Sequence, residues 1–289
     1  MFSNHRHLGR VGVFLLLALA FPRAQATDRH SLDMGIFPYL STRILLDLYQ
    51  PVRIYLTKEL GEPVNLFTAP NFKTYTDQTQ QGVYDIVVTA PHFARLAQRE
   101  AGYIPLVMYT RELLGIVVVA RNSPIRSLQD LKGKRVATPN RLALVTIMGQ
   151  QLLRDNGLIP GLGVRMRDVA SHNNAVLAVL RGEADAAITE HAALEQMPAE
   201  LRNSVRIVAQ TPPVPHVMYL VHGRLGQARI ARIKAALLRF PGTEDGRAFL
   251  KEGGFAGMRP VEEADLKNMD RYLPELKRLL DEGSPKPVL

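Results

Sequence analysis

Residues 84–91, Tyr-Asp-Ile-Val-Val-Thr-Ala-Pro, have the pattern of a β-strand that is buried on both faces and ends in a turn. The run Ile86-Val87-Val88 is continuously apolar, as expected of a strand whose sheet is covered by helices on both sides. The same pattern recurs at Ile116-Val117-Val118-Val119 and at Ala186-Ala187-Ile188. The sequence therefore predicts an α/β protein.

Further strands and helices follow from the same patterns. Ser41 is a candidate N-cap of a helix that runs to Leu60 and stops at Gly61, with a kink or break at Pro51. From Gly226 onward the pattern indicates helices only. We expect short strands at residues 32–37, 64–68, 85–89, 104–109, 115–120, 135–138, 164–169, 184–189, 205–209 and 218–221.

The length of 289 residues allows about two domains. Two segments rich in turn residues, 121–124 and 211–215, are candidate crossings between them. Two crossings predict an inserted lobe, with residues 27–114 and 222–289 in the first lobe and 115–221 in the second. Open α/β sheets bind ligands at the carboxyl ends of their strands, so we expect a site in the cleft between the lobes.

The N-terminus has the form of a cleavable export signal. Arg6 and Arg10 precede an apolar run over residues 11–21, and Ala24-Gln25-Ala26 has the small-x-small form of a cleavage site. We therefore expect residues 1–26 to be a signal peptide and the mature chain to be soluble and periplasmic. The chain contains no cysteine, which excludes disulfides, Cys-ligated zinc and thiolate catalysis.

The formal net charge is +9, and the basic residues are dispersed. A loose basic helix face at Arg224, Arg229, Arg232, Lys234 and Arg239 is typical of a solvated helix. Export and the lack of basic runs argue against nucleic acid as a partner. The charge is compatible with an anionic small ligand.

Several segments match a known family. The chain resembles, over residues 31–222, the phosphate-, phosphite- and phosphonate-type periplasmic solute-binding proteins of ABC importers. The resemblance implies a type II periplasmic binding protein fold, which is α/β, with two lobes joined by two hinge crossings. It also implies a monomer without catalysis, cofactor or metal that hands a small anion to a permease in the inner membrane. The matching segments are 34–39, 50–61, 84–91, 127–137, 171–173, 181–187 and 212–215.

The resemblance also implies where the anion binds. The family holds the oxygens of the anion with hydroxyls and backbone N–H groups at a helix start after the strand that corresponds to residues 135–138. Here the Ser/Thr-rich stretch of the family is replaced by Pro139-Asn140-Arg141-Leu142-Ala143. Thr138 and Asn140 remain candidate donors, and Arg141 is a candidate bidentate anion ligand.

Other candidate ligand-binding residues follow from their positions after predicted strands or at helix starts: Tyr39, Thr89, His92, His172, Glu190 and His216. Glu190 corresponds to an acidic residue that pairs with the ligand amine in aminophosphonate binders. The second carboxylate of such binders is missing, and His216 stands near its place, which argues against an aminoalkylphosphonate. Each of these residues also has a structural alternative, as a turn former, helix cap, packing aromatic or hinge residue.

Two other functions remain open. The same fold can present a ligand to a membrane sensor kinase, or carry an enzyme. The sequence has no nucleophile-elbow, Walker, zinc-peptidase or dinucleotide-binding motif. A metal site formed by His92, His172, His191 and His216 is disfavoured because they lack the usual close ligand spacing.

Overall fold

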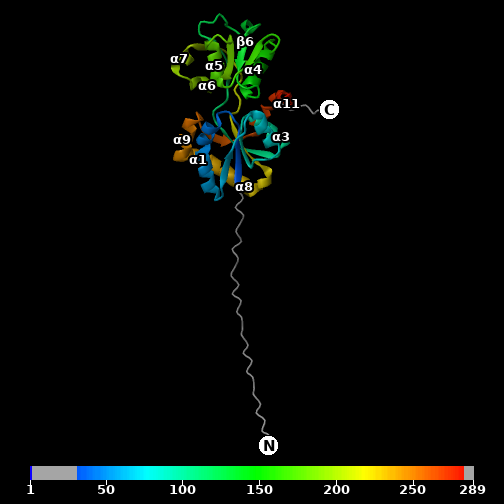
Figure 1. Cartoon of the computed structure of the whole chain (residues 1–289), viewed down its shortest axis with the longest axis vertical. Helices are drawn as coiled ribbons and strands as arrows, with labels where there is room; N and C mark the ends of the chain where they lie inside the picture. The colour runs from blue at the N-terminus through cyan, green and yellow to red at the C-terminus, as the bar shows by residue number, and fades with distance from the viewer. Residues whose placement is uncertain (2–30, 283–289) are drawn as a thin grey trace.

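A computed structural model describes Met1 and residues 31–282. It has two lobes stacked along the long axis of the molecule (Figure 1). The predicted signal peptide, residues 1–26, lies outside the described residues except for Met1. Within the described part of the chain, no helix combines the length and the hydropathy required to cross a membrane. The two α/β lobes confirm the fold class predicted from the sequence.

The first lobe contains a six-stranded sheet with the order β11-β4-β10-β3-β1-β2. Strand β1 pairs in parallel with β2 and β3, whereas β10 runs antiparallel between β3 and β4. Strand β11 pairs antiparallel with β4 at the edge. The strands are β1 Leu32–Ile36, β2 Val64–Phe67, β3 Ile86–Thr89, β4 Tyr103–Tyr109, β10 Met218–His222 and β11 Met258–Pro260.

The second lobe contains a five-stranded sheet with the order β7-β6-β8-β5-β9. Strand β6 pairs in parallel with β7 and β8, and β5 runs antiparallel between β8 and β9. The strands are β5 Gly115–Ala120, β6 Arg135–Thr138, β7 Arg165–Asp168, β8 Ala186–Glu190 and β9 Val205–Gln210. Apart from β11, every strand was predicted to within two residues at each end.

Helices surround both sheets (Figure 1). Ser41 occupies the N-cap position of α1, as predicted, but its side chain makes no cap hydrogen bond; Gly61 ends the helix with a φ of 70°, and its N–H donates to the carbonyl of Thr57. Pro51 was predicted to kink or break this helix. It does not break the helix, because α1 continues through this residue. The helices are α1 Thr42–Leu60, α2 Phe72–Gln80, α3 Pro91–Glu100, α4 Leu144–Asp155, α5 His172–Leu180, α6 His191–Glu195, α7 Ala199–Asn203, α8 Gln227–Arg239, α9 Glu244–Glu252, α10 Glu263–Lys267 and α11 Leu273–Glu282.

The crossings between the lobes differ in part from the sequence-based prediction. The first crossing is residues 110–114, which agrees with the predicted border after residue 114, whereas the candidate crossing at residues 121–124 follows β5 inside the second lobe. The second crossing is residues 211–217, and β10 pairs within the first sheet, so the border near residue 221 is too late. Leu113 and Val214 join the crossings through two backbone hydrogen bonds of 2.8 and 3.0 Å.

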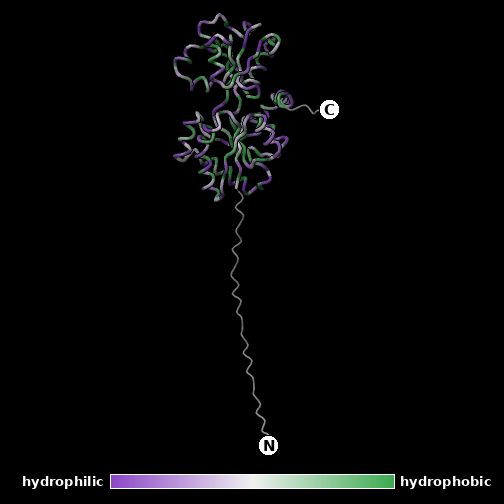
Figure 2. The backbone as a smooth tube through the Cα atoms, viewed as in Figure 1, coloured by the Kyte–Doolittle hydropathy of each residue, from purple (hydrophilic) through white to green (hydrophobic). Residues whose placement is uncertain are grey.

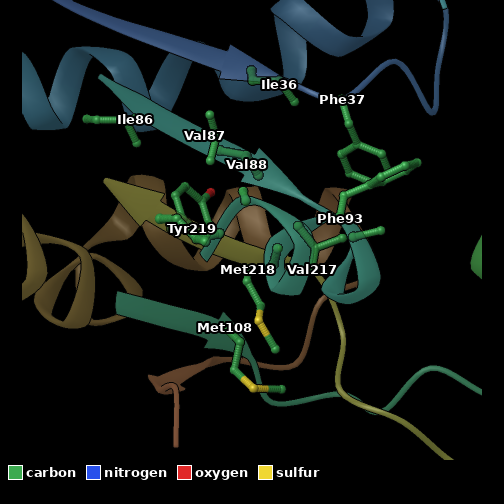
Figure 3. Packing of buried hydrophobic residues seen from close by; sticks show 14 of the residues in the cluster. Ile36, Phe37, Ile86, Val87, Val88, Phe93, Met108, Val217, Met218 and Tyr219 are labelled. Atoms are coloured by element: carbon green, nitrogen blue, oxygen red, sulfur yellow. The ribbon is translucent and has the colours of Figure 1, made fainter. Parts of the chain in front are cut away.

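Apolar residues are concentrated in the centre of each lobe (Figure 2). The core of the first lobe packs β1, β3, β4 and β10 against the flanking helices, and Figure 3 shows part of this packing around Val87, Met218 and Tyr219. The same core includes Leu142, Leu144 and Val145 from the second lobe. The start of α4 is therefore packed against the first lobe, which fixes how the two lobes face each other.

We predict that Gly35→Ala destabilises the first lobe. A Cβ atom at Gly35 in β1 would lie 2.5 Å from the ring of Tyr84, which is 3% exposed and cannot move without displacing its neighbours. Overpacking of this kind costs about 1–3 kcal/mol in the free energy of unfolding, measurable by urea denaturation. Gly242→Ala is the matched control, because no atom lies within 4 Å of the position that a Cβ atom would take there. Equal stability of both variants would contradict the prediction.

Candidate functional site

A cavity of about 250 Å³ lies between the two lobes. Its first-lobe wall comes from the ends of β1 and β3 and the starts of α2 and α3, and its second-lobe wall from the starts of α4, α5 and α6. Residues after α9 and in the second crossing close the remaining side. Five of the residues predicted from the sequence line this cavity together: Tyr39, His92, His172, Glu190 and His216.

The first turns of several helices meet at the cavity. Phe72 begins α2, His92 lies in the first turn of α3, Leu144 begins α4 and His172 begins α5, and all four residues line the cavity wall. The first N–H groups of a helix have no partner within the helix, and its N-terminal end carries a partial positive charge. The cavity therefore lies at the positive ends of four helices, an environment that favours an anion, although Pro91 of α3 has no N–H and Asn71 and Ser171 already accept one N–H each from α2 and α5.

His172 has one ring nitrogen available for a ligand. The backbone N–H of Glu190 donates to Nδ1 of His172 at 3.3 Å, so Nδ1 carries no proton. Burial lowers the pKa of His172, although the charge of Glu190 opposes the shift. The ring is therefore neutral at neutral pH, and its proton is on Nε2. His172 can donate one hydrogen bond from Nε2 to a ligand oxygen.

Glu190 is paired with His216 inside the cavity. Oε1 of Glu190 lies 3.4 Å from Nε2 of His216, and the two side chains are 18% and 10% exposed. Burial is the largest single influence and raises the pKa of Glu190, but the hydrogen bond to His216 and the charges of His216, His172 and Arg111 together outweigh it, and the net shift is downward. Glu190 is therefore ionised at neutral pH and already has a partner from the second crossing.

His92 connects the two lobes. It is fully buried, and its Nε2 lies 3.0 Å from the carbonyl oxygen of Leu142 in the second lobe. A carbonyl can only accept, so Nε2 carries the proton and donates it. Burial lowers the pKa of His92 to about 4, although the hydrogen bond to Leu142 acts in the opposite direction. Neutral His92 thus holds the loop before α4 against α3.

Tyr39 is held in the cavity wall by a chain of hydroxyl groups. Its hydroxyl donates to Tyr49 at 3.4 Å, Tyr49 bonds to Tyr109 at 3.3 Å, and Tyr109 bonds to Tyr219 at 2.9 Å. Burial raises the pKa of all four hydroxyls, so each keeps its proton at neutral pH. The chain links the cavity to α1, β4 and β10 in the core of the first lobe.

The other predicted site residues lie outside the cavity lining. Thr89 is buried in the sheet, and Thr138 donates to Asp168 at 3.2 Å. Asn140 accepts the N–H of Leu142 through its side chain at 2.9 Å. Arg141 points to α11, where it contacts Glu282 at 3.3 Å and the carbonyl of Leu279 at 3.1 Å. Arg141 therefore bridges the lobes and does not line the cavity.

The aromatic part of the wall was not predicted from the sequence. The rings of Phe37 and Tyr39 stack with their centroids 4.6 Å apart, and the rings of Phe72 and Phe93 stack with their centroids 5.9 Å apart. Phe255 lines the opposite side and stacks on Tyr109 at 3.8 Å. Phe37 ends one predicted strand and Phe93 follows another, so both were accessible to the same reasoning as Tyr39. Phe255 was not, because it comes from the C-terminal segment, for which only helices were expected.

The four histidines considered as a metal site do not form one in the described residues. Within residues 31–282, no group of three or more His, Asp or Glu side chains is arranged to hold a metal ion. His92 instead bonds to a backbone carbonyl, and His216 pairs with a carboxylate.

We predict that stability falls as the pH decreases below about 6.5. The folded-state pKa of His92 is about 4 and its unfolded value is about 6.5, so the unfolded chain binds more protons in this range and stability is lost on acidification. The lowered pKa values of His172 and Glu190 act in the same direction. For His92 alone, about 2 kcal/mol is lost between pH 7 and pH 5.

Urea denaturation across this pH range measures the effect. His92→Gln keeps a donor for Leu142 but cannot be protonated, so its stability should depend less on pH. His191→Gln is the control, since His191 lies just outside the cavity lining and is 37% exposed. The same slope for His92→Gln and the parent chain would contradict the prediction.

Comparisons with known proteins identify the family. A family model described as ABC transporter, phosphonate, periplasmic substrate-binding protein matches residues 34–266. PhnD1 of Prochlorococcus marinus in complex with methylphosphonate has 17% identity and a TM-score of 0.76, and covers 86% of this chain and 98% of its own. XAC2383 of Xanthomonas citri bound to ATP has 20% identity and a TM-score of 0.75, and covers 88% and 99%. The aliphatic sulphonate binding protein SsuA of Escherichia coli has 18% identity and a TM-score of 0.59, and covers 89% and 94%. The structures share the fold, and the family match over most of the sequence shows that this chain belongs to the periplasmic substrate-binding proteins of phosphonate ABC transporters.

Proposed function

We propose that this protein captures an oxyanion of the phosphonate, phosphate or phosphite class in the cleft between its lobes and delivers it, unaltered, to an ABC permease from the periplasm. The observation that carries the proposal is the meeting of the first turns of α2, α3, α4 and α5 at one cavity. Backbone N–H groups and positive helix ends stabilise oxyanions without any charged side chain. Nε2 of His172 adds one side-chain donor.

The pairing of Glu190 supports an anion rather than an amine at this site. A free carboxylate in the cavity would favour a cationic group, but Glu190 already lies 3.4 Å from His216. An ammonium ligand would have to displace this partner, and no second carboxylate lines the cavity within the described residues. This favours a ligand without an aminoalkyl group. Methylphosphonate and ATP, the ligands of two similar structures, both carry oxyanions on phosphorus.

Ligand binding would stabilise contact between the lobes. The cavity has walls from both lobes, so a bound anion contacts both at once and favours the closed arrangement over an open one. The contacts of His92 with Leu142 and of Arg141 with Leu279 already join the lobes around the cavity. The anion would add the donors at the helix starts to these contacts.

A thermal-shift screen tests the proposal. Phosphate, phosphite, methylphosphonate, aminoethylphosphonate, sulfonates and carboxylates are each added to the purified chain. At 100 times its Kd, a ligand of the folded state adds about 2.7 kcal/mol of stability, which raises the Tm by about 5–10 °C for a chain of this size. We expect at least one oxyanion on phosphorus to give such a shift. No shift with any oxyanion would contradict the proposal.

Two substitutions test which residues contact the anion. We predict that His172→Ala weakens binding of the best ligand at least tenfold, because a hydrogen-bond donor to a charged group is lost. Arg141→Ala should change affinity less than fivefold, because its contacts with Glu282 and Leu279 are at the partly exposed lobe junction. His191→Ala is the control for His172→Ala. Isothermal titration calorimetry measures the ligand affinity of all three variants. A larger loss of affinity in Arg141→Ala than in His172→Ala would exclude His172 from the site.

A further inference from the structure

We infer, on the basis of the proposed function, that the ligand is an organic oxyanion with an apolar body about the size of a ring, rather than an inorganic anion or methylphosphonate. The charged group of this ligand would bind at the helix starts. Its apolar body would fill the aromatic part of the cavity. The chemistry of the cavity wall carries this inference.

The start of α4 has apolar side chains in place of hydroxyl donors. Its N-cap is Ala143, which makes no side-chain cap hydrogen bond, and Leu144 and Val145 follow as the first helical residues. All three line the cavity, and Leu144 and Val145 are 3% and 2% exposed. An anion here can use backbone N–H groups but no side-chain oxygen. A small anion with oxygens on every side would have to leave several of them against carbon atoms, which is costly.

The opposite wall is aromatic. Phe37, Tyr39, Phe72 and Phe93 form one cluster in which neighbouring rings have centroids 4.6 to 6.0 Å apart. Figure 3 shows Phe37 just after β1 and Phe93 in the first turn of α3, and the ring of Phe72 contacts both. Leu40 extends this wall and is 38% exposed at the rim. This wall offers contact area for a hydrophobic group and few hydrogen bonds.

The side chains that line the cavity carry little charge, which agrees with a ligand that has a single anionic group. Among the described residues, no lysine or arginine lines the cavity, and the only carboxylate on its wall is Glu190. The polar groups beside the helix starts are few: the hydroxyl oxygen of Ser171 caps α5 by accepting the N–H of Asn174, which leaves its O–H as a single donor. The volume of about 250 Å³ is just below the range of about 300–1,000 Å³ for drug-sized ligands. A body larger than one methyl group therefore has space and favourable contacts.

Isothermal titration calorimetry with a graded series tests this substrate class. The series is phosphate, methylphosphonate, propylphosphonate and phenylphosphonate, with benzenesulfonate and benzoate as arms that vary the charged group. Burial of each methylene tightens binding about fourfold. We expect phenylphosphonate to bind at least tenfold more tightly than methylphosphonate. Comparison of the three phenyl ligands then identifies the preferred charged group.

A matched pair of variants locates the apolar body. Leu40→Ala removes part of the rim and should weaken phenylphosphonate binding about five- to tenfold while leaving methylphosphonate unchanged. Ile44→Ala, at a residue that is 58% exposed and outside the cavity lining, should change neither. If methylphosphonate or phosphate binds as tightly as phenylphosphonate, the substrate class is wrong and the proposed function stands. If none of these oxyanions binds, the proposed function fails as well.

Discussion

The return of the chain from the second lobe into the first sheet as β10 is the constraint on which the rest of the structure depends. Strand β10 lies between β3 and β4 and pairs with both, so the second lobe is tied at two points to the centre of the first core. The two crossings bond to each other at Leu113 and Val214. A pair of short, hydrogen-bonded crossings restricts the lobes to movement about one junction. The cavity lies against this junction, because Leu113, His216 and Val217 of the crossings are among its lining residues.

The same topology explains why the polar groups of the cleft converge. Parallel strands end at one edge of each sheet, and the helix that follows each strand begins there. The starts of α3, α4 and α5, which follow β3, β6 and β7, meet at the cavity together with the segment after β1 and the end of β8. His92 and His172 occupy first turns on opposite lobes. Their lowered pKa values come from burial, and each uses one nitrogen for a backbone group.

The cleft combines a fold suited to anions with walls suited to hydrocarbon. Ala143, Leu144 and Val145 line the cavity at the start of α4, and Arg141 is directed to α11. In the function that we propose, backbone N–H groups and Nε2 of His172 would hold the anion. The apolar body that we infer would contact the aromatic wall. This division of roles connects the family membership of the chain to a ligand specificity of its own.

The sequence by itself determined the elements of the fold and the approximate position of the site. Strands such as β3 and β8 and the ends of α1 are local features, because continuous apolar runs, a cap at Ser41 and a left-handed Gly61 depend on neighbouring residues. The tertiary structure decided the partners: β10 joined the first sheet, Arg141 bonded to α11, and Phe255 entered the wall from the C-terminal segment. These outcomes depend on contacts between residues far apart in the chain, which leave no periodic pattern in the sequence. A polar side chain such as that of Arg141 turns toward the distant group with which it can form a hydrogen bond.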